Sequence, residues 1–448
     1  MDQADVLVIG SGQGGAPFAT EMAGRGKRVV YFERGSWGGS CLNYGCIPSK
    51  MFLASAHAAG RARGAVDLGV HAEVTVDFPA VMERIQQVTG SRSEGVRSRL
   101  EKAGVRTVEA EARFTGERTV SGGDLTVQAP LVVIDTGLSP LVPPIDGLED
   151  VPYFTYKTFW DIEQLPRETV ILGAGYVGME LGQGLARLGS RVHLIDQLDR
   201  PIAGEEEDVS ALLQEALEED GVTFHLGTTA KSVARQKGVV TVELENGDSV
   251  SGGALLVATG QRPNTRALDP EAGGIRLDDD GYVRVDDRFQ TTCEGVYAIG
   301  DVTGQPAFTH VSWEDHRRLL GILDGEDRTQ LDRVLGYAFF TDPQVARAGS
   351  ALAQAREQGH NARQVELALS EVTRAHEIGR TTGFYRMVVD EDTDKILGAT
   401  LVGPETAELI HIFIAHIEAG STWHELEQST HIHPTFGEGL PTLARELK

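Results

Sequence analysis

The sequence predicts an α/β protein with two similar parallel-sheet domains and a third domain of mixed α and β structure. Two observations indicate the repeated domain. A strand, a glycine-rich loop and a helix open the chain, and the same succession returns near residue 170. The third observation is a change of pattern after about residue 330, where strands near residue 388 and at 399–402 and a helix at 408–418 follow no such loop.

The size and composition set the general class. The chain has 448 residues, which exceeds the size at which one core usually keeps growing, so several packed domains are expected. With 41% hydrophobic and 24% charged residues and no long apolar run, the composition is that of a soluble globular protein without a membrane span. The N-terminus lacks the basic start of a secretory signal, so we expect a cytoplasmic location.

The charge and the cysteine content exclude further classes. The formal net charge of -25 argues against nucleic-acid binding, which depends on Lys and Arg side chains that neutralise phosphates. Three cysteines are too few for a disulfide framework, and two of them, Cys41 and Cys46, stand close together in the sequence. We therefore expect a reducing compartment and a catalytic or metal-binding role for this pair.

The first glycine loop follows an apolar strand at Val6–Ile9. Gly10, Gly12 and Gly15 have the spacing of a dinucleotide-binding loop, in which glycines allow a tight turn and a close approach of the backbone to a pyrophosphate. The N-terminus of the following helix then faces the negative charge. Glu33 ends the next strand about 20 residues later, where a carboxylate can hydrogen-bond a ribose hydroxyl. These features predict a Rossmann-like fold.

The second glycine loop repeats this arrangement after another apolar strand. Gly173, Gly175 and Gly178 have the same spacing, and Asp196 ends the next strand at the same offset from its loop as Glu33. An acid at this position accepts hydrogen bonds from the ribose diol of NAD and repels the 2′-phosphate of NADP. We therefore expect one dinucleotide per fold, with NADH preferred over NADPH in the second.

Each fold has its own closing strand and turn. Residues 131–137 form an apolar strand that ends in Asp-Thr-Gly, and residues 255–260 repeat it with the ending Ala-Thr-Gly. We count Gly260 among the cofactor-contacting residues. A Pro-rich stretch at 140–147 and an acidic stretch at 323–329 predict connections between packed units.

The segment from Gly38 to Lys50, which contains Cys41 and Cys46, is the most specific signal in the sequence. As a zinc site the cysteine pair is incomplete, because zinc takes four ligands and no second pair exists. At this segment the chain resembles the class I pyridine nucleotide-disulfide oxidoreductases, which include dihydrolipoyl dehydrogenase, glutathione reductase and mercuric reductase. The resemblance covers essentially the whole chain. It implies that Cys41 and Cys46 form a redox-active disulfide beside a flavin.

The resemblance also implies the cofactors, the domains and the subunit arrangement. FAD is expected in the first fold and NAD in the second. The FAD-binding domain is expected at residues 1–145 and 266–330, the NAD(P)-binding domain at 146–265 and the dimerisation domain at 331–448. The protein is expected to be a homodimer in which each active site takes its cysteines from one chain and its His433 from the other.

Two more motifs match the family near the ends of its cofactor and dimerisation domains. Asp301 follows an apolar strand in the family's second FAD motif, whose acid contacts the sugar-alcohol chain of the flavin, although such an Asp is also a common helix cap. His433 stands before a proline, and the resemblance pairs it with Glu438. An imidazole held by a carboxylate can take and return protons near neutral pH, which thiol-disulfide exchange requires.

Three further residues match the family by resemblance alone. Lys50 and Glu180 are expected to form an ion pair beside the flavin ring, and Tyr176 is expected to be an aromatic gate over the nicotinamide pocket. Their ordinary alternatives are a surface lysine, a first-turn helix glutamate and a packing aromatic.

These residues together predict a two-electron relay from NADH through FAD and the cysteine disulfide to a small-molecule disulfide or dithiol. By resemblance, Cys46 is the thiol next to the flavin and Cys41 is the interchange thiol that meets the substrate, with His433 as its base. An inactive scaffold would be expected to lack the cysteine pair or the His433–Glu438 pair, and the sequence has both.

The sequence narrows the substrate to two alternatives. Asp196 disfavours glutathione-type reductases, which usually take NADPH, and the C-terminal residues 442–448 lack the cysteine pair that mercuric reductases carry there. A dihydrolipoyl dehydrogenase-like activity is therefore the leading hypothesis. Residues 308–313 and 374–384 look more like mercuric-reductase-like and oxidant-resistance flavoproteins, and this is the alternative.

Overall fold

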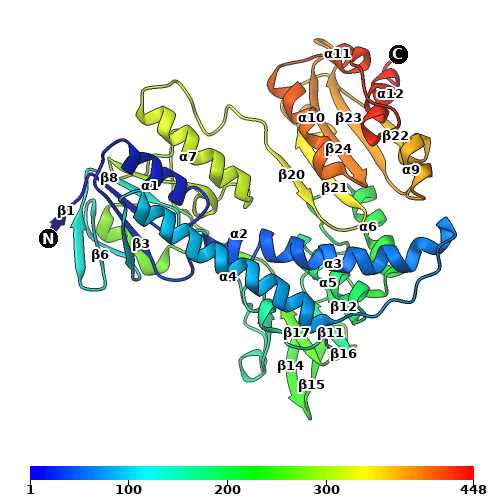
Figure 1. Ribbon diagram of the computed structural model, residues 1–448, viewed down its shortest axis with the longest axis horizontal. Coiled ribbons are helices and arrows are strands. Elements are labelled where there is room, and N and C mark those ends of the chain that lie inside the picture. Colours follow the sequence, from blue (N-terminus) through cyan, green and yellow to red (C-terminus); the bar gives the residue numbers. More distant parts are fainter.

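The computed structural model describes residues 1–448, and its three main sheets lie in three regions of the molecule. In Figure 1 the sheet nearest the N-terminus lies at the left, the second sheet at the bottom and the C-terminal sheet at the upper right. None of the helices combines the length and the apolar character that a membrane span requires.

The first dinucleotide fold is built around a parallel five-stranded sheet. Its strands, in spatial order, are β19 (Val296–Ala298), β8 (Leu131–Ile134), β2 (Val6–Ile9), β3 (Val29–Glu33) and β4 (Arg106–Glu109). Helix α1 (Gly15–Gly24) follows β2, and β3 ends at Glu33, as the sequence predicts. Because β19 returns to pair with β8, the segment that carries Asp301 lies beside the first glycine loop.

The second dinucleotide fold repeats this plan, which confirms the predicted repeat. Its parallel strands, in spatial order, are β10 (Phe154–Thr155), β17 (Ala254–Val257), β11 (Glu168–Leu172), β12 (Arg191–Ile195) and β13 (Val222–His225). Helix α5 (Tyr176–Leu188) begins inside the second glycine loop, and α6 (Glu207–Glu219) precedes β13.

Three small sheets were not anticipated from the sequence. They consist of β1 (Asp2–Gln3) with β7 (Leu125–Gln128), β6 (Thr119–Gly122) and β5 (Arg113–Gly116); of β14 (Ala230–Gln236) with β15 (Val239–Leu244) and β16 (Ser249–Gly252); and of β18 (Gln261–Pro263) with β9 (Leu138–Pro140). The β9–β18 pair joins the two segments where the chain passes between the folds, so the predicted connection at 140–147 starts from a paired strand.

The C-terminal region forms an antiparallel sheet. Its strands, in spatial order, are β20 (Gly336–Phe339), β21 (Gln344–Gly349), β24 (Ile396–Gly403), β23 (Phe384–Asp390) and β22 (Ala362–Ala368), and its helices are α8 (Leu352–Glu357), α9 (Thr373–Glu377), α10 (Thr406–Glu418), α11 (Trp423–Gln428) and α12 (Gly439–Arg445). The predicted strands near 388 and at 399–402 and the helix at 408–418 correspond to β23, β24 and α10.

Two long helices, α3 (Cys46–Gly64) and α4 (Phe78–Lys102), hold the cysteine segment in place. Figure 1 shows α3 running across the second fold, and α3 packs closely on α5. The approach is so close that a Cβ built on Gly184 of α5 would lie 2.4 Å from the Phe52 ring of α3. These helices share a buried core with β11, β12 and residues of the C-terminal sheet such as Val345. The helix that begins at Cys46 is therefore fixed against both neighbouring units.

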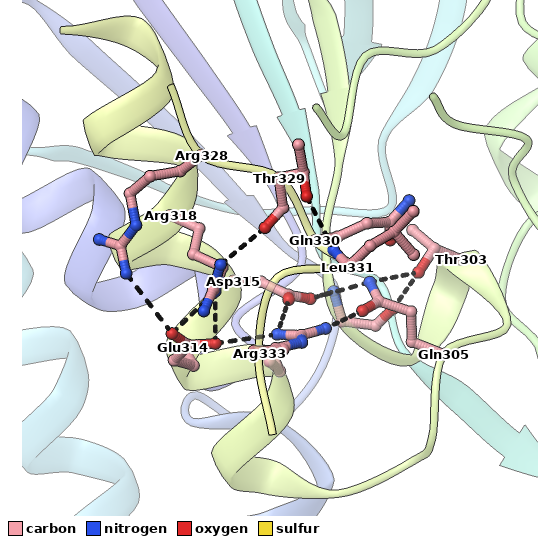
Figure 2. A network of polar contacts seen from close by, with 12 residues as sticks. Thr303, Gln305, Glu314, Asp315, Arg318, Arg328, Thr329, Gln330, Leu331 and Arg333 are labelled. Carbon is pink, nitrogen blue, oxygen red and sulfur yellow. Dashed lines mark hydrogen bonds and ion pairs between the residues drawn. The ribbon is translucent and has the colours of Figure 1, made fainter. Parts of the chain in front are cut away.

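Ion pairs between side chains hold the connection that follows α7 (Thr309–Leu323). Figure 2 shows Arg318 and Arg333 joining this connection to α7. Arg318 pairs with Asp332 of the connection, and Arg333 pairs with the buried Asp315 of α7 at 2.7 Å. The segment at 323–329 is thus a connection, as predicted, although Leu323 still belongs to the helix.

Candidate active site

One large cavity of about 1120 Å³ brings most of the predicted site residues together. Its walls come from both glycine-loop folds and from β20 and α10 of the C-terminal region. The predicted residues that line it are Gly10, Gly12, Glu33, Cys41, Cys46, Lys50, Tyr176, Glu180 and Asp301. The predicted residues outside its lining are Gly15, Gly173, Gly175, Gly178, Asp196, Gly260, His433 and Glu438.

The two cysteines reach this cavity from consecutive short segments. Cys41 lies in α2 (Gly39–Asn43), and Cys46 is the first residue of α3. Both are free thiols in this structure, and Cys46 is exposed in the cavity. A helix N-terminus stabilises negative charge, so the position of Cys46 favours its thiolate.

The pKa values of the two thiols are shifted in opposite directions. The pKa of Cys46 is lowered to about 6, first by the hydrogen bond from Cys41, then by the Thr309 hydroxyl and by the positive charge of Lys50, while burial opposes the shift. The same hydrogen bond and burial raise the pKa of Cys41. At neutral pH the reduced pair therefore consists of a Cys46 thiolate and a neutral Cys41 thiol.

Thr309, which the sequence analysis did not select, contacts Cys46 directly. Its Oγ1 lies 3.1 Å from the Cys46 sulfur, and it is the first residue of α7. Two helices thus begin at this sulfur. No sequence signal marks the contact, because the two residues are far apart in the chain and a hydroxyl at a helix start is usually a cap.

Replacing Thr309 with Val is expected to raise the pKa of Cys46 by about one unit, because a hydrogen bond to a charged sulfur is lost. The Thr309→Ser control keeps the hydroxyl and should keep the midpoint. The measurement is the rate of Cys46 alkylation against pH in the reduced protein, followed by mass spectrometry. An unchanged midpoint in the Val variant would show that the Thr309 hydroxyl does not set the acidity of Cys46.

Lys50 and Glu180 form the expected ion pair, with Nζ and Oε2 2.7 Å apart. Lys50 lies one turn after Cys46 on α3, and the buried Glu180 lies on α5, so the pair bridges the two folds. Phe340, after β20, supports both members: its N–H donates to Glu180 Oε1 at 2.8 Å, and its ring centroid is 4.6 Å from Lys50 Nζ. Sequence reasoning missed Phe340, since nothing local marks its role.

Tyr176 is the first residue of α5 and belongs to an aromatic cluster. The sequence analysis did not select the other members of this cluster as site residues. Its ring stacks on Phe339 with centroids 5.9 Å apart and planes 5° from parallel. Beside it, Phe308 stacks on Tyr337 at 5.3 Å. Burial raises the pKa of Tyr176, so its hydroxyl stays neutral. Rings from three separate segments therefore form one wall of the cavity near the thiols.

The two glycine loops have the same local geometry. Gly10 and Gly173 both have positive φ, and a Cβ on either would lie 2.4 Å from a backbone carbonyl oxygen, so only glycine fits. Glu33 accepts from the Ser11 N–H at 2.7 Å and from the Gly35 N–H at 2.6 Å. Asp196 accepts in the same way from the N–H groups of Ala174 and Leu198, at 2.7 and 2.9 Å. Each acid thus also holds its own loop.

Asp301 lies in a short 3₁₀ turn (Gly300–Thr303) at the carboxyl end of β19. Its pKa is raised to about 7, first by burial and then by the charges of Cys46 and Asp315. A carboxyl group in this state can accept or donate a hydrogen bond, which suits the hydroxyl-bearing sugar-alcohol chain of a flavin.

Cys293, unlike Cys41 and Cys46, is buried in the core of the first fold and does not reach the cavity.

His433 and Glu438 form the predicted pair, but away from the cysteines of their own chain. His433 Nδ1 lies 2.6 Å from Glu438 Oε2, and 71% of the His433 side chain is exposed. Neither residue lines the cavity. Nearby His431 is bound to Ser429 at 2.8 Å, as expected for a bystander. The acid–base pair is thus presented on the outside of the C-terminal region.

The residues present fit the two dinucleotides implied by the sequence. The cavity runs without interruption from the first loop and Glu33 to Cys46, and its volume exceeds that of an ordinary small-molecule pocket of roughly 300–1,000 Å³. It therefore fits FAD. Tyr176 and Glu180 lie between the second loop and the same space, which fits the nicotinamide end of NAD(P)H.

Comparisons with known proteins identify the family of the chain. Residues 4–315 match the family described as pyridine nucleotide-disulphide oxidoreductase, and residues 336–444 match the dimerisation domain of that family. The chain is 33% identical to a dihydrolipoyl dehydrogenase of Haloferax volcanii, over 97% of this chain and 94% of that protein. It is 35% identical to a mercuric reductase of Streptomyces lividans, over 98% of this chain and 95% of that protein.

A solved structure is similar over the whole length. It is the Cu(II) complex of the HOCl-induced flavoprotein disulfide reductase RclA from Escherichia coli, with a TM-score of 0.92, 28% identity and coverage of 100% of both chains. The family resemblance drawn from the sequence and the expected fold are therefore both confirmed.

Proposed function

Because the chain belongs to the pyridine nucleotide-disulphide oxidoreductase family and is therefore a flavoprotein oxidoreductase, we propose that it passes two electrons from NADH to a small disulfide through Cys46 and Cys41. One observation carries the proposal. Two thiols, one with a lowered and one with a raised pKa, lie in the same cavity as the Lys50–Glu180 ion pair and the first glycine loop. FAD, when bound, supplies the hydride acceptance and two-electron transfer that the side chains cannot perform.

The cysteines then divide the thiol chemistry between them. Two electrons and one proton convert the Cys41–Cys46 disulfide into a Cys41 thiol and a Cys46 thiolate, because the pKa of Cys46 is low and its sulfur is stabilised by Thr309 and Lys50. Cys41 attacks the substrate disulfide. One substrate sulfur leaves as a thiol, and Cys46 then attacks the mixed disulfide to release the second and to restore the Cys41–Cys46 bond.

The attack by Cys41 requires the removal of a proton, because its pKa is raised. We propose that His433 of a second copy takes this proton and returns it to the leaving sulfur, with Glu438 holding the imidazole. The exposure of His433 and its position outside the cavity of its own chain support a homodimer with shared sites. The dimerisation-domain match at residues 336–444 supports the same arrangement.

Dihydrolipoyl dehydrogenase-like chemistry is the leading proposal for the substrate. It is supported by the acid at the end of β12, by the His433–Glu438 pair and by the similarity to the enzyme of Haloferax volcanii. The second candidate is a metal-ion or oxidant-linked reductase, favoured by the whole-length likeness to RclA and by the similarity to the Streptomyces lividans mercuric reductase. The cysteines of residues 1–448 are Cys41, Cys46 and Cys293, so the C-terminal domain at residues 336–444 supplies no thiol to deliver a metal.

Steady-state assays of the purified protein distinguish these candidates. NADH oxidation is measured with lipoamide, with small disulfides, with mercuric ion and with Cu(II), and NAD reduction is measured with dihydrolipoamide. The leading proposal predicts the highest kcat/KM for the lipoyl pair in both directions. A higher kcat/KM for a metal ion would favour the second candidate, and no turnover with any of them would contradict the disulfide-reductase proposal.

The Asp196→Asn variant is expected to narrow the preference for NADH over NADPH by about tenfold, because the carboxylate that repels the 2′-phosphate loses its charge. Asn keeps an oxygen to accept from the Ala174 or Leu198 N–H groups, so the loop should persist. The control Asp199→Asn removes an exposed charge nearby and should change nothing. The ratio of kcat/KM for the two coenzymes is measured, and a wild type that prefers NADPH would contradict the assignment.

A further inference from the structure

The two dinucleotide folds differ at one position beneath their glycine loops. Asp135 and Ala258 each follow the closing strand, β8 or β17, and each precedes a Thr-Gly pair. The carbonyl oxygens of these two residues lie at the same place, 2.4 Å from a Cβ built on Gly10 or on Gly173. The backbone is thus repeated, while the side chain changes from an acid in the first fold to a methyl group in the second.

The Asp135 side chain lies directly under the first loop. Only 3% of the residue is exposed, and Oδ2 accepts from the N–H of Gly15, the first residue of α1, at 2.6 Å. A Cβ built on Gly12 would lie 2.4 Å from the same oxygen, whereas one built on Gly175 in the second fold would meet nothing within 4 Å. The carboxyl group therefore occupies a helix N-terminus, the kind of site where an anion is expected to bind.

No cation faces this carboxyl group. The residues packed around it are Gly14 before α1, Gly15 of α1, Tyr31 of β3, Asp301 after β19, and Ser312 and Asp315 of α7. Arg333 is bound to Asp315 at 2.7 Å and to Glu314 at 3.1 Å. Figure 2 shows both contacts. Tyr31 donates to the Gly10 carbonyl, and Ser312 Oγ lies 3.5 Å from Oδ1.

These surroundings determine the protonation state of the Asp135 carboxyl group. Burial raises its pKa well above the usual range, the Gly15 N–H opposes the shift, and the charges of Asp301 and Asp315 add to it. A dinucleotide would bring two phosphate charges into the same cavity, which Asp135 also lines. Like charges in a site shielded from water repel strongly, so the acid and the pyrophosphate cannot both be ionised there without a large cost.

We propose that Asp135 links FAD binding to proton uptake, so that the first fold retains FAD tightly only while Asp135 is the neutral acid. This inference rests on the proposed FAD site in the first fold. Wherever Asp135 is ionised in the FAD-free protein, FAD binding takes up a proton, and the affinity falls by up to about tenfold per pH unit as the pH rises. The second fold, with Ala258, has no such link.

The test is the dissociation constant of FAD for the FAD-free protein, measured by flavin fluorescence from about pH 6 to about pH 9. The wild type is compared with Asp135→Asn, which is neutral and similar in shape, and with Asp135→Ala, which copies the second fold. The ratio of the wild-type constant to either variant's constant is expected to rise at least tenfold across the range. Asp301 is present in all three proteins, so the part of its titration that does not depend on Asp135 cancels in the ratio.

Two results would overturn the proposal. One is a ratio that stays constant with pH, and the other is FAD binding at least tenfold weaker in both variants at every pH. Circular dichroism and NADH binding, which depends on the second fold, show that the variants are folded. If the wild type itself binds no FAD at any pH, the proposed function fails along with this inference, whereas tight but pH-independent binding contradicts the inference alone.

Discussion

The Cys46→Ser variant is expected to lose NADH-dependent turnover of a disulfide substrate by about 10,000-fold, because a thiol relay stops when either sulfur is removed. Serine keeps the size and the hydrogen bond to Thr309 but cannot form the disulfide. Cys41→Ser is expected to lose turnover to the same extent. Both variants should still bind FAD, since neither cysteine belongs to the glycine loop.

The third cysteine supplies the matched control. Cys293 is buried in the core of the first fold, away from the cavity, so Cys293→Ser should keep turnover within a few-fold of the wild type, with at most a small loss of stability. Steady-state rates with NADH and lipoamide are compared in the three variants. Retained disulfide reduction in Cys46→Ser or Cys41→Ser would remove these residues from the relay.

A mixed dimer of one Cys46→Ser chain and one His433→Ala chain is expected to regain roughly half of the wild-type activity, although each parent homodimer is nearly inactive. If each site takes its cysteines from one chain and His433 from the other, one site of the mixed dimer carries both lesions and the other carries none. The placement of His433 on the outside of its own chain, 71% exposed, is the physical reason for this expectation.

Differently tagged chains, purified through both tags, give a verified mixed dimer for this measurement. The control is His431→Ala, which removes a neighbouring imidazole bound to Ser429 and should leave the homodimer active. No recovery in the verified mixed dimer would place the whole site within one chain. An active monomer would do the same.

The repeated folds could be predicted because their requirements are local. At Gly10 and Gly173 the backbone has positive φ and a carbonyl oxygen lies where a side chain would begin, so the glycines are visible in the sequence itself. Glu33 and Asp196 follow at a fixed distance because one helix and one strand separate them from their loops. The antiparallel C-terminal sheet was expected only in part, from two of its strands and α10.

The helices α3 and α4 were missed because their sequences carry a weak signal. In α4 the buried residues Ile85 and Val96 are separated by exposed or half-buried positions that include Gly90 and Gly95, so the apolar spacing is interrupted. In α3 the helical face is set by packing against α5, where Gly184 admits the Phe52 ring. Tertiary contact, and not periodicity, fixes these elements.

Within the site, the residues that sequence reasoning missed act through long-range contacts. Thr309 reaches Cys46, and Phe340 reaches Lys50 and Glu180, from segments far along the chain. Asp135 stands in an ordinary strand-to-turn sequence, and nothing local shows that its carboxyl group is buried under the glycine loop, where the second fold has Ala258. In the proposed dimer, the position of His433 relative to the cysteines depends on a second chain, which one sequence does not describe.

The most direct test of the proposed relay is an anaerobic titration of the purified, FAD-loaded wild type with NADH, followed by absorption spectroscopy. One equivalent of NADH is expected to produce a long-wavelength charge-transfer band, because the Cys46 thiolate, with a pKa lowered to about 6, then lies against oxidised flavin. Cys46→Ser should lack the band. Bleaching of the flavin by the first equivalent without this band, or an unchanged band in Cys46→Ser, would contradict the relay.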